Sequence, residues 1–122
     1  CGENACTEFE FKSMIKQKAA TYIQPSVIKV GGIYEMFKII EHAEKNNISV
    51  MPHTAYFGPG FLATIQLASL MKKETYIERF YLDIDQEFYP NFKKAMNGKY
   101  KLPSGPGLGI DLDYKRLSKY EI

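Results

Sequence analysis

The chain has 122 residues, of which 45% are hydrophobic and 25% are charged, a balance that predicts one globular domain and excludes a disordered segment. The net charge is only +2, with lysine and glutamate mixed along the sequence, so a nucleic-acid-binding protein is not predicted. No apolar run approaches the roughly 20 residues of a membrane span, and no signal peptide is recognisable. Two cysteines, Cys1 and Cys6, match neither a disulfide framework nor a metal-binding CxxC pair, which predicts reduced thiols in a cytoplasmic protein.

The first predicted elements are a helix and a buried strand. Thr7 and Glu10 have the spacing of a capping box, in which the N-cap hydroxyl is followed three residues later by glutamate. Apolar residues at helical spacing then continue to about Ala20. The apolar run from Tyr22 to Val30 is rich in β-branched residues and ends at a glycine pair, so it predicts a short buried strand.

The middle of the chain repeats this order. From Ile33 to Ala43, apolar residues recur on one helical face and charged residues occupy the other, and the pair Asn46-Asn47 predicts the end of this helix. Residues 48–51 predict a second short strand. A third helix is expected over about residues 61–72, and a third strand over residues 76–84.

Helices and strands therefore alternate, which predicts right-handed βαβ units and a parallel sheet. Four polar residues, Glu3, Ser26, His53 and Glu78, follow one another at separations of 23, 27 and 25 residues. One strand, one helix and two loops of a (β/α) barrel need about that length of chain. Because the chemistry of such barrels lies at the C-terminal ends of the strands, we expect these four side chains to face one site.

The pattern changes after Asp85. We therefore divide the chain into a barrel part, residues 1–85, and a tail, residues 86–122, that packs on it. The glycines of residues 102–113 fit neither the GxGxxG nor the GxxxxGK[ST] phosphate loop, so a rigid turn is predicted there. A short helical turn is expected over residues 117–122.

Five motifs of the chain, taken together, resemble one enzyme family. They are GEN (2–4), QPSVIKVGGI (24–33), MPHT (51–54), IER (77–79) and PSGPGLGIDLD (103–113). In this order and spacing they are similar to the mandelate racemase/muconate lactonizing enzyme family of the enolase superfamily, along essentially the whole chain. The resemblance implies an α/β fold, the C-terminal part of a (β/α)7β TIM-like barrel, with a tail returning to a separate capping domain.

The resemblance also implies a chemistry. Enzymes of this family bind Mg²⁺ through three carboxylates and remove the proton α to the carboxylate of a small substrate. Glu3 matches the third metal ligand, His53 the general base of the racemase-like and acid-sugar dehydratase branch, and Glu78 the acid that hydrogen-bonds the enediolate. The other two metal ligands would lie on earlier strands of the barrel.

Ser26 departs from the family pattern. Members of the histidine branch have QPD here, with the aspartate paired to the histidine, and other branches have a catalytic lysine. We therefore expect His53 to lack its carboxylate partner, which lowers its basicity. The Ser26 hydroxyl could donate to His53 or to a water, or the residue could be a small filler. Lys29, at the opposite strand parity, is expected to point away from the site.

The preferred interpretation is the C-terminal portion of a Mg²⁺-dependent lyase, an acid-sugar dehydratase, because racemisation needs a second, opposed base that this chain does not contain. One alternative is a racemase or epimerase of the same family. The other is a non-catalytic half-barrel whose open strand edges require copies of itself or the N-terminal half of a barrel. For each site residue a plain structural role also stands: Glu3 at the surface, His53 capping a loop, and Glu78 paired with Arg79.

Overall fold

The computed structural model describes residues 1–80, 82, 88–90, 92 and 95–121. Its elements are α1 (Glu8–Lys16), β1 (Tyr22–Ile23), α2 (Ile33–Lys45), β2 (Ser49–Val50), α3 (Gly58–Ala68), α4 (Tyr114–Leu117) and the 3-10 turn η1 (Ser118–Tyr120). Strands β1 and β2 pair in parallel, with Tyr22 opposite Ser49 and Ile23 opposite Val50. One of the predicted parallel β–α–β units, β1–α2–β2, is therefore confirmed.

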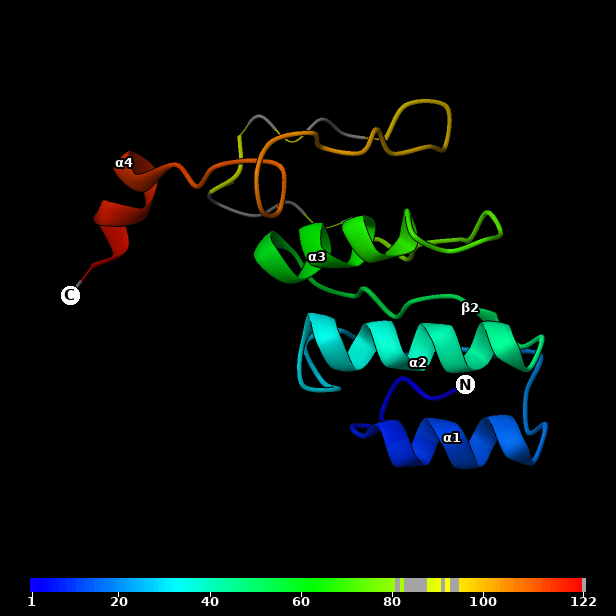
Figure 1. Cartoon of the computed structure of the whole chain (residues 1–122). Helices are drawn as coiled ribbons and strands as arrows, with labels where there is room; N and C mark the ends of the chain where they lie inside the picture. Colours follow the sequence, from blue (N-terminus) through cyan, green and yellow to red (C-terminus); the bar gives the residue numbers. More distant parts are fainter. Residues whose placement is uncertain (81, 83–87, 91, 93–94, 122) are drawn as a thin grey trace.

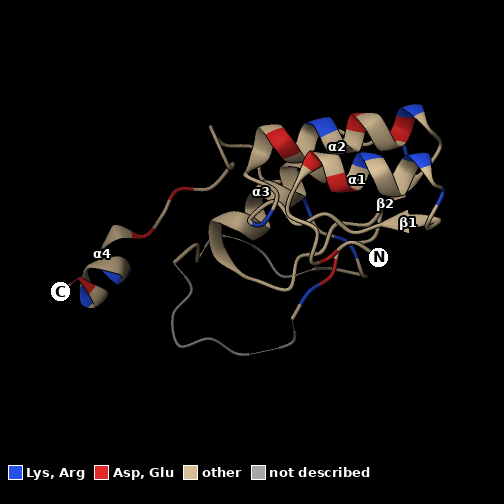
Figure 2. Cartoon of the chain, turned by 90° about the horizontal axis from the view of Figure 1, so that it is seen from below, with Lys and Arg blue, Asp and Glu red and all other residues tan. Residues whose placement is uncertain are grey.

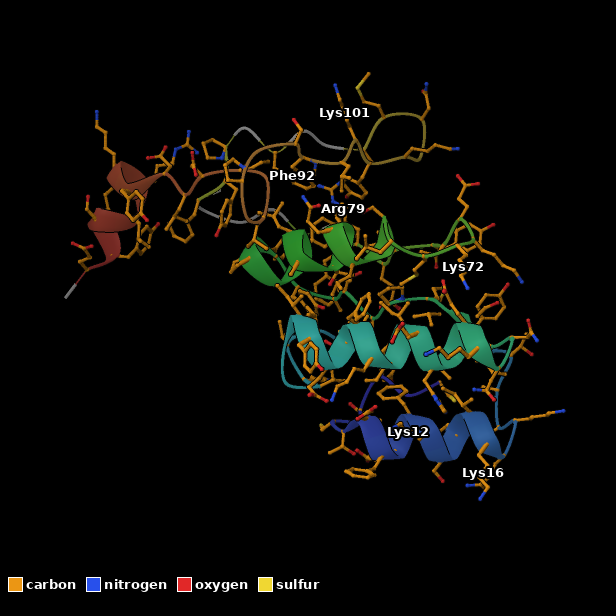
Figure 3. The ribbon with its side chains drawn as sticks, in the orientation of Figure 1. Lys12, Lys16, Lys72, Arg79, Phe92 and Lys101 are labelled. Carbon is orange, nitrogen blue, oxygen red and sulfur yellow. The ribbon has the colours of Figure 1, made fainter. Side chains whose placement is uncertain are left out.

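Helices α1, α2 and α3 lie side by side. In Figure 1, α2 lies between α1 and α3, and Figure 2 shows the strands on one side of α1 and α2. Acidic and basic residues are mixed along α1 and α2 (Figure 2), and Lys16 points away from α2 (Figure 3). Within the described part of the chain, no helix is long and apolar enough to cross a membrane.

The start of α1 carries the predicted capping box. The Thr7 hydroxyl accepts from the amide of Glu10 at 3.3 Å, and the Glu10 carboxylate accepts from the amides of Thr7 and Cys6, both at 3.0 Å. The helix ends at Lys16, earlier than the predicted Ala20, because Lys18 adopts a left-handed conformation with φ of 49°. Apolar spacing alone did not show this turn.

The capping box makes the start of α1 sensitive to acid. The hydrogen bond from the Thr7 hydroxyl, aided by the amides of Cys6 and Thr7, lowers the pKa of Glu10 below its ordinary value. Its stabilisation is therefore present above the unfolded-state pKa and lost as pH falls through the folded-state pKa. We expect the amide of Thr7 to lose protection from hydrogen exchange, after correction for intrinsic rates, as pH falls from 7 to 3. In the Glu10→Gln variant the pH dependence should flatten, and identical profiles would contradict this assignment.

The run from Tyr22 to Val30 is not one strand. After β1, the amide of Val30 donates to the carbonyl of Ser26 at 3.0 Å, and the amide of Gly32 donates to the carbonyl of Val27 at 3.0 Å. The chain therefore forms a helical turn here. Val27 and Val30, three residues apart, are both buried, whereas Ile28 between them is exposed. The β-branched composition predicted a strand, but the burial follows a helical period, and the prediction was wrong.

The predicted third strand also differs. Residues 76–80 belong to no strand, whereas residues 81, 83 and 84 lie outside the described residues. The Thr75 hydroxyl donates to the carbonyl of Val50, and the Thr54 hydroxyl donates to the carbonyl of Glu78. Threonine side chains thus hold this segment beside the end of β2.

Two helices agree closely with prediction. Helix α2 begins at Ile33 and ends before Asn47, whose φ of 58° is left-handed as expected for a residue that stops a helix. Helix α3 begins at Gly58, with a proline in its first turn, and ends at Ala68, so it lies slightly earlier than the predicted residues 61–72. Buried side chains of α1, α2 and the strands, among them Phe11, Met36 and Ile39, form the core.

The glycine-rich stretch is a closed turn that contacts α3. The amide of Gly105 donates to the carbonyl of Gly109 at 3.1 Å. The side-chain amide of Gln66, on α3, donates to the carbonyls of Pro103 at 3.0 Å and Leu108 at 3.2 Å. Beyond this turn, α4 and η1 lie to one side of the layer of α1 and α2 (Figures 1 and 2), and the helical turn begins earlier than predicted.

Candidate active site

Three extended segments end side by side. The amide of Gln24 donates to the carbonyl of Cys1 at 2.8 Å, and the amide of His53 donates to the carbonyl of Pro25 at 3.0 Å. Glu3, Ser26 and His53 therefore follow neighbouring segments at the same, carboxyl-terminal end.

His53 and Glu78 are in direct contact. The Nδ1 atom of His53 lies 2.6 Å from Oε2 of Glu78, and the backbone amide of Thr54 donates to the same oxygen at 3.2 Å. The hydroxyl of Thr54 donates to the backbone carbonyl of Glu78. The His53 side chain is 19% exposed and that of Glu78 is 37% exposed, so molecules from solvent can reach the pair.

This contact corrects one expectation. His53 was expected to lack a carboxylate partner because residue 26 is serine, yet Glu78 occupies that position at its Nδ1 atom. The carboxylate comes not from the strand end before His53 but from the segment after α3, which Thr54 and Thr75 hold against the end of β2.

Ser26 belongs to a buried chain of hydroxyl groups. Its side chain is fully buried, and its hydroxyl donates to that of Tyr56 at 3.4 Å. The Tyr56 hydroxyl lies 3.1 Å from that of Thr64, which in turn donates to the carbonyl of Gly60 at 3.0 Å. Sequence reasoning missed Tyr56 and Thr64; a threonine within the mostly apolar sequence of α3 was the available signal.

Lys29 does not point away from these residues. Its Nζ atom donates to the carbonyl of Glu3 at 2.8 Å and to Oδ1 of Asn4 at 3.2 Å. The expectation assumed strand parity, but residues 26–31 form a helical turn, which rotates the side chain toward the Glu3–Asn4 segment. Lys29 thus fixes the backbone of the residue predicted to bind metal.

Glu3 offers one carboxylate for a cation. Its side chain is exposed and makes no hydrogen bond or ion pair with the described residues. Within that same part of the chain, no group of three or more His, Cys, Asp or Glu side chains could hold a metal ion. A carboxylate oxygen suits Mg²⁺, but one such ligand does not make a site. Further carboxylates would have to come from elsewhere.

Parallel β–α units with polar residues gathered at the strand ends define the class of α/β-barrel proteins. The family model described as enolase C-terminal domain-like matches residues 1–116, and the chain belongs to this family. Its fold is the C-terminal part of the (β/α)7β barrel, as predicted. The resemblance to mandelate racemase/muconate lactonizing enzymes is confirmed.

Individual relatives are similar at low identity. D-xylonate dehydratase of Haloferax volcanii is 28% identical over 123 residues, which cover 99% of this chain and 30% of that protein. A D-galactonate dehydratase family member of Salmonella virchow is 27% identical over 91% of this chain and 27% of its own length. A crystal structure of a mandelate racemase/muconate lactonizing protein from Paracoccus denitrificans PD1222, complexed with magnesium, is 28% identical with a TM-score of 0.79, covering 97% of this chain and 32% of that one. The chain thus spans less than a third of the length of these relatives.

Proposed function

We propose that the gene product containing this chain removes the proton α to the carboxylate of an acid sugar and that it acts as a dehydratase, with His53 as the base. The observation that carries this proposal is the 2.6 Å contact between His53 and a carboxylate at the end of the barrel strands. The similarity to D-xylonate dehydratase and to a D-galactonate dehydratase family member supports the substrate class and the loss of water.

His53 is suited to take a proton. With Nδ1 held by Glu78, its Nε2 atom is the one that makes no hydrogen bond to the described residues, so it can face a substrate. Histidine is the side chain best placed to exchange a proton near neutral pH. The positive imidazolium that forms lies against the Glu78 carboxylate, which stabilises it.

The remaining predicted residues have supporting roles in this proposal. Glu3 would contribute one carboxylate ligand to Mg²⁺, and that ion would supply positive charge to stabilise the anion formed from the substrate. Ser26 holds the hydroxyl of Tyr56 by a hydrogen bond. Residues 1–85 form the barrel part, and residues 86–122 form the tail toward a capping domain, with the contacts of Gln66 joining the two.

The direct test is an assay of the gene product with D-xylonate, D-galactonate and related acid sugars. In deuterated buffer with Mg²⁺, a dehydratase releases water and gives a 2-keto-3-deoxy acid that carries deuterium from the solvent at C3. A racemase or epimerase, the alternative within the family, returns the stereoisomer with deuterium at the α-carbon. Absence of both exchange and product formation with every acid sugar would contradict the proposal.

The metal role of Glu3 has its own test. We expect Glu3→Gln to weaken Mg²⁺ binding by about tenfold or more, because it removes an anionic ligand oxygen from a cation that prefers carboxylates. Isothermal calorimetry of the gene product measures this affinity. Glu41→Gln, an exposed substitution on α2, is the matched control and should leave the affinity unchanged. Equal affinities for all three proteins would remove Glu3 from the metal site.

The non-catalytic alternative is favoured by one observation, the exposed apolar surface around α2. Ile28, Ile33 and Tyr34 are 59%, 52% and 71% exposed. We expect the 122-residue chain expressed by itself to associate, either with its own copies or with the N-terminal half of a barrel, to cover this surface. Sedimentation velocity measures its mass. A concentration-independent monomer with a cooperative unfolding transition would contradict this expectation.

A further inference from the structure

The Glu78 carboxylate is held in a fixed position. Its Oε2 atom receives two donors, Nδ1 of His53 at 2.6 Å and the amide of Thr54 at 3.2 Å. Thr54 is fully buried, and its hydroxyl also donates to the carbonyl of Glu78. Thr54 therefore holds both the backbone and the carboxylate of Glu78, and the residue that it fixes lies directly against the adjacent histidine.

This geometry determines which ring nitrogen of His53 carries the proton. An ionised carboxylate can only accept hydrogen bonds, so at a separation of 2.6 Å the proton must lie on Nδ1. The neutral ring then has Nε2 without a proton, which is the form that can act as a base. Histidine that is free in water favours the opposite tautomer, so a partner is needed to hold this one.

Residue 26 cannot supply this partner. Ser26 has no charge, its side chain is fully buried, and its hydroxyl is bonded to Tyr56. The carboxylate at Nδ1 comes instead from the segment that follows α3. Residue 26 and Glu78 approach the end of β2 from different segments. Residue 26 follows β1, which pairs with β2, whereas Thr54 binds the segment that carries Glu78.

We propose that Glu78 is the positioning residue of His53: it holds the imidazole in the Nδ1–H tautomer and stabilises the imidazolium, in place of a carboxylate at position 26. This role rests on the proposed function in that His53 is the base. It assigns Glu78 to the histidine and not to an oxygen of the substrate. Thr54 completes the arrangement as the group that fixes Glu78.

The test compares Glu78→Met with the parent gene product. Methionine has nearly the same length but no acceptor oxygen, and Glu74→Met, on the same segment at the surface, is the matched control. Nitrogen-15 chemical shifts of the His53 ring, recorded without substrate, report the tautomer. We expect the parent and Glu74→Met to show Nδ1–H, and Glu78→Met to shift to Nε2–H. The kcat should fall about 100-fold in Glu78→Met because the base is misoriented. The KM should stay within about threefold of the parent value because substrate binding is not disturbed.

A second variant guards against misfolding. Glu78→Gln keeps the shape and one acceptor oxygen but loses the charge, so the tautomer should be retained while kcat falls about tenfold. An unchanged ring spectrum and kcat in Glu78→Met, or an unchanged kcat in Glu78→Gln, would overturn the proposal. So would a parent spectrum with Nδ1 unprotonated, or a large rise in KM with kcat preserved, which would indicate a substrate contact.

The spectra separate this inference from the proposed function. If no acid sugar exchanges its α-proton but the parent shows Nδ1–H and Glu78→Met loses it, the proposed reaction is wrong and the positioning of His53 by Glu78 stands. If exchange occurs and His53 keeps its tautomer without Glu78, the proposed reaction stands and the positioning role is wrong.

Discussion

Replacing His53 with asparagine in the gene product is expected to abolish both dehydration and exchange of the α-proton of acid sugars. Asparagine is similar in size and can still accept a hydrogen bond, but its amide cannot take up a proton near neutral pH. General base catalysis typically contributes about 10²–10⁴-fold, and without a base in place we expect a loss of at least about 10³-fold. NMR measures both reactions, as deuterium at the α-carbon of the returned acid sugar and as formation of the 2-keto-3-deoxy acid.

His42 provides the matched control for this substitution. It lies on α2, away from the contact with Glu78, and its carbonyl oxygen accepts from the side chain of Asn46. His42→Asn should therefore exchange at the parent rate. If His53→Asn also exchanges at the parent rate with an intact fold, the base lies elsewhere and the assignment to the histidine branch is wrong.

Structural features that depend on neighbouring residues were predictable from the sequence. The capping box at Thr7 and Glu10 depends on two side chains three residues apart, and both of its hydrogen bonds form. Helix α2 has a wide apolar stripe and a terminal asparagine with positive φ, so its start and end follow from neighbouring residues alone. Where the residues that determine a feature lie within one helical turn of it, the prediction from the sequence was correct.

The turn after β1 was not predictable in the same way. Its residues have the composition of a strand, and only the burial of Val27 and Val30, against the exposure of Ile28, follows a helical period. That burial depends on packing partners that are distant in sequence. The prediction for Lys29 was wrong for the same reason. Successive side chains point to opposite sides only along a strand, and Lys29 lies in a helical turn and contacts Glu3.

The place of the candidate site in the fold was predictable from the sequence, but its contacts were not. The spacing of His53 and Glu78 placed both near the end of the sheet, and they lie together there. Their contact depends on how Thr54 holds the segment after α3, which is a tertiary interaction without a sequence motif. For Ser26, likewise, the sequence indicated a small polar residue but not its bond to Tyr56.

Phe11 connects the core to the segment that carries Glu3. Its ring is fully buried in the core cluster that α1 and α2 share. It also lies against Gly2, where an added Cβ atom would come within 2.7 Å of the ring atom Cε1. Gly2 has a φ of 106°, which favours glycine, so the backbone there can pass close to the ring. The ring therefore packs against the residue immediately before Glu3.

Replacing Phe11 with alanine is expected to lower the free energy of unfolding of the gene product by about 3–5 kcal/mol, because it removes a buried aromatic ring and leaves a cavity between α1 and its neighbours. Urea unfolding measures the loss.

Phe9→Ala is the matched control: Phe9 lies on the same helix but is 81% exposed, so its replacement should change stability by no more than about 0.5 kcal/mol. If Glu3 binds Mg²⁺ as proposed, the affinity for Mg²⁺ should fall in Phe11→Ala, where the Glu3 segment loses its support, and not in Phe9→Ala. Equal stability of the two variants would contradict the packing of α1, whereas a large loss of stability with unchanged Mg²⁺ affinity would show that Glu3 does not depend on this ring.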